Sequence, residues 1–400
     1  MRKIVCILMM AFAVCGGALG QSADFEMNGT VLVKYKGKAA SVAIPAGVTV
    51  IGKEAFANNH NITSLTIPAG VTTISNTAIY NCSKLTSITI PSSVVTIGDW
   101  ALSNCISLTN ITIPEGVATI GENAFSSCNK LANIAIPASV ASIGNGAFSS
   151  CRSLTSITAD ARNSAYSSAD GILFSKDKTV LVSYPAGKQA KNYTVPAGVT
   201  SIGFEAFSSC VSLTSITIPA GVTSIEKGAF RDCISLTNMI IPAGVTSIGD
   251  SAFFFCKSLT TVTIPSSVTS IGFSAFEGCG KLKDIVIPKS VTSIKAAAFS
   301  MCGSLASITI PEGVTSIEDS LFSRCRSLTN IVIPSSVTSI GWNAFEECSS
   351  LANITIPPSV TSIGYSAFDD CTNLRTVTVS RKTTILDHAI PDGVKIIYSD

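Results

Sequence analysis

Apolar and polar residues alternate along the chain in a pattern that repeats every 23 residues. LTSITIPAGVTSIEKGAFRDCIS, residues 213–235, is followed by the near copy LTNMIIPAGVTSIGDSAFFFCKS, residues 236–258. With Leu213 as position 1, the unit reads L-T-S-I-T-I-P-x-x-V-T-S-I-G-x-x-A-F-x-x-C-x-x. Its proline recurs at intervals of 23 residues, with one interval of 59, at Pro45, Pro68, Pro91, Pro114, Pro137, Pro196, Pro219, Pro242, Pro265, Pro288, Pro311, Pro334 and Pro357. Such a repeat predicts a solenoid of stacked coils.

The spacing within one unit predicts how each coil is built. Ile216 and Ile218 alternate with polar neighbours and predict a short strand with one buried face, which Pro219 ends. Val222 and Ile225 point inward from a second, shorter extended segment, and the alanine, phenylalanine and cysteine that follow point inward from a helical or 3-10 turn. We therefore predict a leucine-rich-repeat solenoid that is mainly β. It should be one elongated domain of about thirteen coils with one continuous parallel sheet formed by the L-x-x-I-x-I segments.

Position 21 is a cysteine in twelve units and Asn59 in the first unit. The cysteines are Cys82, Cys105, Cys128, Cys151, Cys210, Cys233, Cys256, Cys279, Cys302, Cys325, Cys348 and Cys371. Asn and Cys are both small and can bond the backbone of a neighbouring coil. An even number of cysteines also fits a disulfide framework. Because equivalent side chains point in parallel, the pattern favours a structural ladder of buried free thiols over disulfides and over a metal site.

The N-terminus is typical of a secretory signal peptide. Two basic residues precede an apolar run over Ile4–Val14, and small residues follow up to Gly20, where we expect cleavage. A lipidated Cys15 is an alternative that the sequence favours less, because Val14 stands where a small residue is expected. The predicted division is a signal peptide over 1–20, an N-terminal cap over 21–38, the solenoid over 39–373 and a C-terminal cap over 374–400.

The long interval places 36 extra residues between Leu154 and Pro196. We interpret residues 160–192 as a β-hairpin insertion on one enlarged coil, with strands over Ile172–Phe174 and Val180–Tyr184. The hairpin is either a binding element or a device that adjusts curvature at a junction between two duplicated arrays. Its polar tip consists of Lys176, Asp177 and Lys178.

The combination I-P-x-x-V-x-x-I-x-x-x-A-F-x-x-C, with the D-G-I-L-F and Y-P-A-G motifs of Asp170–Gly187, resembles the BspA-like leucine-rich-repeat surface proteins of bacteria. The resemblance implies a right-handed solenoid that is secreted or on the cell surface, in a family implicated in adhesion to host proteins and other cells. It implies no catalytic residue. No C-terminal anchor or sorting signal is recognisable, so the mode of surface attachment is open.

Charge and histidine content argue against several functions. After removal of the predicted signal, which holds 2 of the 27 basic residues, 25 basic residues face 25 acidic ones, a balance without the footprint of a nucleic-acid-binding protein. Past the N-terminus no apolar run is long enough to span a membrane. The only histidines, His60 and His388, lie near opposite ends of the array. We predict no catalytic residue, no metal site and no cofactor.

Position 15 varies between charged residues and aromatic ones. We predict partner-binding residues at Phe204, Phe273, Trp342 and Tyr365 and at the hairpin tip, Lys176, Asp177 and Lys178. The alternative for the rings is packing over adjacent coils. The predicted function is adhesion through binding of a protein ligand. The alternative is a structural spacer or surface coat without a specific ligand.

Overall fold

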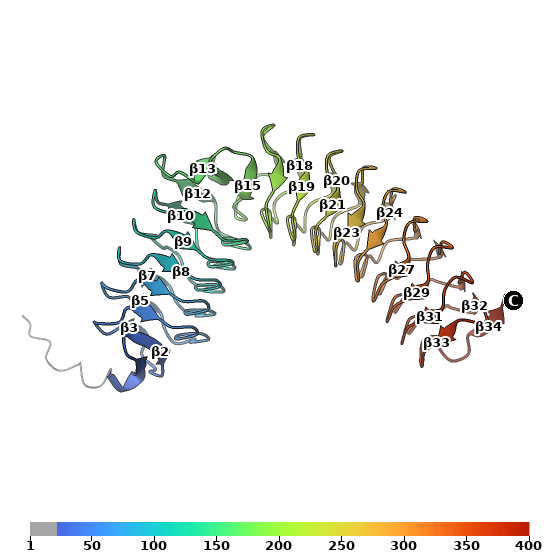
Figure 1. Cartoon of the computed structure of the whole chain (residues 1–400), viewed down its shortest axis with the longest axis horizontal. Helices are drawn as coiled ribbons and strands as arrows, with labels where there is room; N and C mark the ends of the chain where they lie inside the picture. The colour runs from blue at the N-terminus through green and yellow to red at the C-terminus, as the bar shows by residue number, and fades with distance from the viewer. Residues whose placement is uncertain (1–21, 400) are drawn as a thin grey trace, which may run out of the picture.

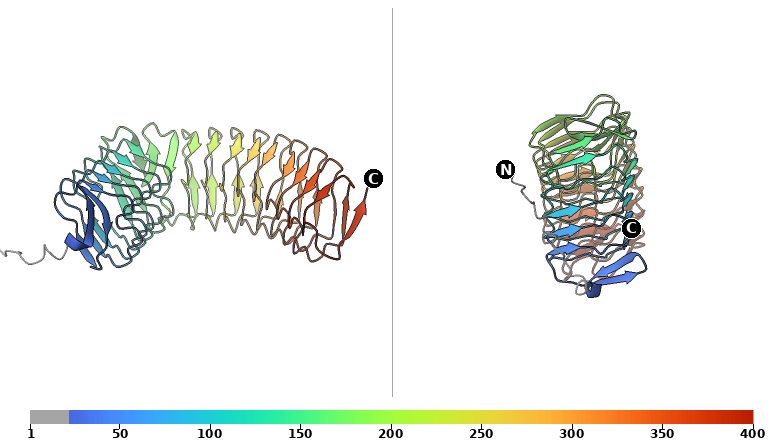
Figure 2. Two further views of the ribbon diagram at one scale, coloured as in Figure 1. Left: turned by 60° about the horizontal axis from the view of Figure 1, so that its bottom comes forward. Right: turned by 90° about the vertical axis from the view of Figure 1, so that its left-hand side faces the viewer.

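The computed structural model describes residues 22–399 as one curved solenoid, with coils stacked side by side along an arc (Figure 1). The predicted signal peptide and Cys15 fall within residues 1–21, outside the described range. Apart from the 3-10 helix η1 (Ser22–Asp24), every regular element of residues 22–399 is a β-strand. Figure 2 shows these strands in rows along the arc. The predicted leucine-rich-repeat solenoid is confirmed.

The L-x-x-I-x-I segments form an outer ladder, named for its place along the outer side of the arc (Figure 1). Equivalent residues pair across coils, as Ile308 does with Ile331, and the central side chain is buried while its neighbours are exposed. The strands bond in groups of only two or three. They are β3 (Ser41–Ala43), β5 (Ser64–Thr66), β7 (Ser87–Thr89), β10 (Asn133–Ile136), β12 (Ser156–Ala159), β16 (Asn192–Thr194), β18 (Ser215–Thr217), β20 (Asn238–Ile240), β22 (Thr261–Thr263), β24 (Asp284–Ile285), β26 (Ser307–Thr309), β28 (Asn330–Val332), β30 (Asn353–Thr355), β32 (Thr376–Val379) and β34 (Lys395–Tyr398).

The V-T-S-I segments form the second ladder, whose sheets contain seven, eight and four strands. The prediction of one continuous sheet in the L-x-x-I-x-I segments is therefore wrong, because the outer side of a curved stack is longer and its strands separate more. The strands of the second ladder are β1 (Phe25–Asn28), β2 (Val31–Tyr35), β4 (Val50–Ile51), β6 (Thr73–Ile74), β8 (Thr96–Ile97), β9 (Thr119–Ile120), β11 (Ser142–Ile143), β13 (Tyr166–Ala169), β14 (Ile172–Ser175), β15 (Val180–Ser183), β17 (Ser201–Ile202), β19 (Ser224–Ile225), β21 (Ser247–Ile248), β23 (Ser270–Ile271), β25 (Ser293–Ile294), β27 (Ser316–Ile317), β29 (Ser339–Ile340), β31 (Ser362–Ile363) and β33 (Thr384–Ile385).

Positions 14–22 of each coil form a third side, the turn wall. Its turns are closed by bonds of the 3-10 kind, such as Phe254 N–H to the Ser251 carbonyl at 3.1 Å. They do not continue into a helix because positions 16 and 20 are left-handed, with φ of 53° at Ser251 and 55° at Phe255. Neighbouring turns bond to each other, as Phe253 N–H does to the Ala275 carbonyl at 2.8 Å.

An Asp or Asn at position 15 links one coil to the next. In four coils its Oδ1 accepts the position-15 N–H of the following coil at 2.7–2.9 Å. A Cβ at position 14 of that following coil would lie 2.4–2.7 Å from the same oxygen, so the residue there has to be glycine. The four pairs are Asn76 with Gly98, Asp99 with Gly121, Asp250 with Gly272 and Asp319 with Gly341. After Phe204 and Phe273, which carry no such oxygen, position 14 is Glu226 and Lys295.

The core is a set of stacked side chains, one from each coil. The rings at position 18 stack from Phe207 to Phe368 with centroids 5.1–5.9 Å apart and planes within 18° of parallel. In the N-terminal arm, Ile79 and Leu102 take the same position and are equally buried. The apolar surface that a single coil leaves open is thus covered by its two neighbours.

All twelve cysteines at position 21 are buried. Each thiol points at the carbonyl of position 18 in the preceding coil, at 3.1 Å for Cys256 and Phe230. Burial raises the pKa of Cys151 to about 12, so that its thiol stays protonated and can donate to that carbonyl. In the first coil, Asn59 Oδ1 instead accepts the N–H groups of Asn61 and Ile62 at 3.0 and 3.2 Å.

The long interval contains a complete coil, which we call the enlarged coil (residues 154–189). Asp160 stands where a proline is expected, and β12 pairs in register with β10. From Asp160 to Pro196 there are 36 residues, so this coil is 13 residues longer than the 23-residue unit. The predicted insertion of 36 residues into a single unit is therefore wrong, because the substitution of Asp160 for proline hid one coil.

The predicted hairpin is present, but it is part of the ladder. β14 pairs antiparallel with both β13 and β15, and β15 continues in parallel with β17. A buried Asn163 fixes the start of the enlarged coil. Its Nδ2 donates to the carbonyls of Pro137 and Val140, and its Oδ1 accepts the N–H groups of Ala165 and Tyr166. The structure thus favours the junction interpretation over an appended binding element.

The enlarged coil is wide on one side only. Three strands, β13 to β15, separate β11 from β17 in the second ladder, where a regular coil would supply one. On the turn wall only two residues lie between Leu181 and Tyr184, where a regular coil has four. Ser150 Oγ, in the coil before the enlarged one, therefore lies 3.1 Å from both Ser208 and Ser209 Oγ, in the coil after it. This wedge bends the stack into an elbow with the turn wall inside (Figure 1).

Strand β14 divides the core into two clusters. Leu173 belongs to the cluster of the N-terminal arm, whereas Ile172 and Phe174 belong to that of the C-terminal arm. All three are at most 3% exposed. Successive residues of a strand point to opposite faces, so β14 is buried on both sides.

The two ends of the array are closed by irregular segments. At the start, β1 and β2 form an antiparallel hairpin, and the rings of Phe25, Tyr35 and Phe56 follow one another at 5.1 and 5.3 Å. At the other end, β34 adds to the outer ladder beside β32. Such segments cover strand edges that would otherwise pair with other chains.

We expect Leu173→Ala and Phe174→Ala to destabilise different arms, each by about 2–5 kcal/mol, because each opens a different core. Hydrogen exchange followed by mass spectrometry should show faster exchange over 25–157 for the first variant and over 193–389 for the second. Equal acceleration of both arms in both variants would contradict the division of the core.

We expect thiol titration of denatured, unreduced protein to find all twelve cysteines of the mature chain free. Native protein should react slowly at neutral pH, because burial raises the pKa of Cys151 and Cys371 to about 12. The stability that the buried thiols gain by staying protonated should be complete below about pH 8.5 and should be lost as the pH rises towards their folded-state pKa values. Six stable disulfides would overturn this account.

Cys256→Ser should lower the free energy of unfolding, measured in urea, by about 1–3 kcal/mol.

Candidate functional site

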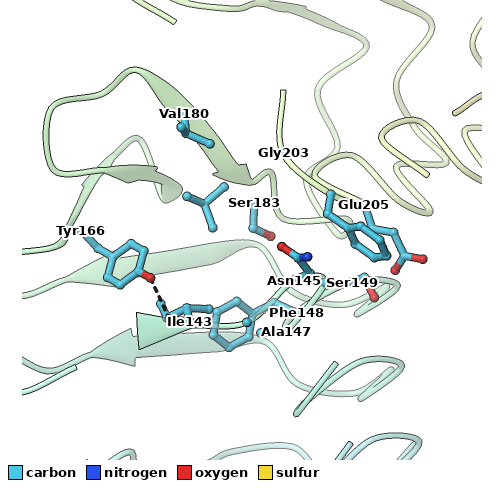
Figure 3. A pocket seen from close by; sticks show the side chains of 14 residues that line it. Ile143, Asn145, Ala147, Phe148, Ser149, Tyr166, Val180, Ser183, Gly203 and Glu205 are labelled. Carbon is cyan, nitrogen blue, oxygen red and sulfur yellow. Dashed lines mark hydrogen bonds between the residues drawn. The ribbon is translucent and has the colours of Figure 1, made fainter. Parts of the chain in front are cut away.

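The elbow encloses a cavity of about 200 Å³, the junction cavity, where the enlarged coil lacks part of its turn (Figure 3). Residues 143–149 line one side and Gly203, Phe204 and Glu205 the other, and Val180, Val182 and Ser183 of the enlarged coil complete it. The cavity is therefore a direct product of the wedge.

Tyr166 replaces a backbone partner at this point. Its hydroxyl accepts the Ile143 N–H at 2.7 Å (Figure 3). The last strand of the N-terminal ladder, β11, thus pairs with β9 on one side and is bonded to this side chain, instead of to a strand, on the other. Burial raises the pKa of Tyr166, which keeps the phenol neutral. Its role here is structural.

Glu205 is the acidic group of the junction cavity. It is half-buried, and burial raises its pKa, an effect that Ser149, Arg231 and Lys227 only partly oppose. In Figure 3 its carboxylate lies beside Ser149, across the cavity from Tyr166. No second carboxylate or histidine lines the cavity with it, so the paired groups of general acid–base chemistry are not assembled there.

A second hollow, the elbow pocket, lies on the turn wall next to Glu205 and measures about 440 Å³. Five turn segments from both arms meet in it. They contribute Trp100 from the third coil, Asn123, Ser126, Ser127 and Asn129 from the fourth, Ser150 and Arg152 from the fifth, Glu205 and Ser209 from the coil after the enlarged one, and Arg231 and Asp232 from the next. Residues about 130 positions apart in the sequence thus share one pocket only because the stack bends here.

A groove of about 850 Å³ lies on the outer ladder where β24 and β26 are not bonded. Its rim carries Val286 and Val332, which are 79% and 58% exposed, while most other coils have threonine at this position. Proline side chains line it as well. This is an apolar surface on the side of the molecule opposite the elbow pocket.

The four aromatic residues predicted at position 15 have different surroundings. Phe273 and Trp342 are 52% and 58% exposed, and their N–H groups are held by Asp250 and Asp319. Trp342 contacts Tyr365 edge to face at 5.7 Å, whereas Phe273 stands three coils away. Phe204 lies in the junction cavity, with Lys227 Nζ 5.9 Å from its ring. The structure therefore places only Trp342 and Tyr365 together.

The predicted hairpin tip is mostly engaged within the chain. Lys176 Nζ donates to the carbonyls of Ala161 and Asn163. Asp177 Oδ1 accepts from Ser175 Oγ and from Thr179, which lowers the pKa of Asp177. Lys178 is exposed. The tip is thus a locally bonded turn.

The described chain brings together few groups with catalytic chemistry. His60 bonds Ser83 Oγ at 2.9 Å near one end of the array, and His388 is exposed near the other. Over residues 22–399 no three side chains from His, Cys, Asp and Glu are placed to hold a metal ion. No helix in the same range is long and apolar enough to cross a membrane.

Sequence reasoning missed the elbow pocket. Trp100 carried a usable signal, since an aromatic residue stands at position 16, where the other 23-residue coils have Glu, Thr, Asn, Gly, Ser or Ala. No sequence signal indicated that Asn129 and Arg152 lie near Arg231, because this proximity results from the bend.

The two ladders, the turn wall and the stacked core define a leucine-rich-repeat solenoid. Six copies of the BspA type leucine rich repeat region match residues 34–169, 185–305 and 269–392, so the chain belongs to this family. A search of curated proteins finds no match.

Solved structures of bacterial leucine-rich repeat proteins are similar to this one. One from Eubacterium ventriosum is 27% identical with a TM-score of 0.67, covering 86% of this chain and 88% of that chain. One from Bacteroides ovatus is 28% identical with a TM-score of 0.52, covering 93% and 94%. A leucine rich cell surface protein from Faecalibacterium prausnitzii is 28% identical with a TM-score of 0.43, covering 89% and 92%.

We expect Glu205→Gln to stabilise the protein at pH 7. Burial raises the folded-state pKa of Glu205, so its ionisation above the unfolded value of about 4.3 works against folding. The gain in melting temperature should shrink as the pH falls below that value. Glu346→Gln, at a carboxylate that accepts a hydrogen bond from Ser323 Oγ, is the control. A gain that is independent of pH would contradict the assignment.

Proposed function

We propose that this is a secreted or cell-surface adhesion protein that binds a protein ligand. Membership of the BspA type family supports a surface role. The observation that carries the proposal is the exposure of Phe273, Trp342 and Tyr365 on a rigid array, at 52%, 58% and 44%. Large rings on fixed backbone lose little conformational entropy on binding and dominate many protein interfaces.

The exposure of these rings favours binding over packing. A ring that served only to cover the adjacent coil would be largely buried, as the stacked position-18 rings are at 0%. Asp250 and Asp319 hold the backbone of Phe273 and Trp342, so the rings project from ordered positions. Neither side chain is needed for the core.

The test is binding to immobilised fibronectin, laminin and type I collagen by surface plasmon resonance. We expect the triple variant Phe273→Ala, Trp342→Ala, Tyr365→Ala to bind at least tenfold more weakly, because interface rings often contribute more than 2 kcal/mol each. The control is Val286→Thr with Val332→Thr, which removes exposed apolar groups from the outer groove and installs the residue of most other coils.

Loss of binding in the control alone would move the interface to the outer groove and refute the role of the aromatic row, that is, of Phe273, Trp342 and Tyr365. Absence of binding by the parent to all three proteins, and to intact host cells, would favour the alternative of a spacer or surface coat.

A further inference from the structure

The elbow pocket has the composition of a site for a neutral, hydroxyl-rich ligand. Its volume of about 440 Å³ falls in the range of about 300–1,000 Å³ typical of small-molecule sites. Trp100 is its only apolar lining residue, and the others carry hydroxyl, amide, carboxylate or guanidinium groups. Hydroxyl and amide groups both donate and accept, which suits ligands that do the same.

The charges of the pocket balance. Arg152 and Arg231 face Glu205 and Asp232, and Arg231 is held between Asp232, at 3.5 Å, and the ring of Phe254, at 4.7 Å. A site for phosphate or carboxylate would present an excess of positive charge. The balance therefore favours an uncharged ligand.

Trp100 is presented at a backbone position that usually holds a small or polar residue. Its φ is 57°, and its N–H and carbonyl are fixed by Glu122 and Ser103 at 2.7 and 3.2 Å. A non-glycine residue in this region costs free energy, and a bulky one more than serine or asparagine. The ring is nevertheless 41% exposed, so core packing does not account for the choice.

The pocket also holds an unused acceptor. Asn129 Oδ1 is one of three buried side-chain polar atoms that lack a hydrogen-bond partner in residues 22–399. A buried acceptor without a donor is costly, and rotation of the Asn129 side chain toward the pocket would let a ligand hydroxyl satisfy it.

We propose that the elbow pocket binds a pyranose unit of a neutral carbohydrate. The indole of Trp100 packs against the C–H face of the sugar. Its hydroxyls bond Asn129 and Arg152 of one arm and Glu205 and Asp232 of the other. The ligand thereby spans the elbow. This site is independent of the aromatic row proposed for protein binding.

Saturation-transfer NMR on the full mature chain tests the proposal, with glucose, galactose, mannose, N-acetylglucosamine, maltose and lactose as neutral probes and glucuronate and glucose 6-phosphate as anionic ones. We expect at least one neutral probe to bind. Trp100→Ser should abolish the signal, because it removes the ring that packs on the sugar. The variant should still fold, since serine occupies the same left-handed position in four other coils. The exposed Arg152→Gln, which carries little risk to folding, should weaken binding several-fold. Trp342→Ser removes the other tryptophan and should leave the signal unchanged.

Absence of transfer from every neutral probe, tighter binding of the anionic probes, or unchanged binding in both pocket variants would overturn the proposal. Failure of the aromatic-row variant to lose protein binding has no bearing on these results. For a probe that binds, retention on a polysaccharide of that sugar assigns the ligand to free glycan. Retention on a glycoprotein that is lost after deglycosylation assigns it to a protein-linked glycan, and either result supports the site.

Discussion

The stacking of equivalent residues at an interval of 23 is the constraint on which the whole structure depends. A single coil has no core of its own, and its inward side chains are buried only by the same residues one coil earlier and later. The phenylalanine stack and the aspartate that holds the next coil's N–H join residues 23 apart, and the thiol that bonds the preceding coil's carbonyl depends on the same register. A change of one residue in one coil would displace all three contacts at once, which accounts for the constant length of the regular coils.

The enlarged coil shows how length can change without loss of register. Its ends keep the interval, through β12 on one side and Tyr184, whose N–H bonds the Ala206 carbonyl, on the other. The extra residues extend only the second ladder, while the turn wall is shortened. The result is a bend, a core divided by β14, and two hollows that a straight array would not have. The most distinctive surface of the molecule is therefore set by one coil and lined largely by its neighbours.

Much of the fold could be predicted because its determinants are local and repeated. Val222, Ile225 and Cys233 each occur in a repeated pattern that predicts their burial, and all three are at most 2% exposed. The candidate site could be predicted only in part. Exposure of Phe273 follows from its position, but the partial burial of Phe204 depends on the missing turn opposite it. Lys176 reads as a free charge in sequence, yet the loop folds back so that two carbonyls accept from it. The elbow pocket depends on curvature, which no local pattern encodes.

The link between an aspartate or asparagine at position 15 and a glycine in the following coil determines which segments of the gene can be exchanged. A segment cut from leucine to leucine separates the two partners. Placing the coil that begins at Leu282 directly after the coil that contains Asp250 would set the Cβ of Lys295 against the aspartate oxygen, at the place where Gly272 now lies. A segment cut from position 15 to the next position 14 carries both partners and fits anywhere in the array. Duplication or recombination with that phase preserves the fold, and an engineer who lengthens or shortens the solenoid should use the same boundary.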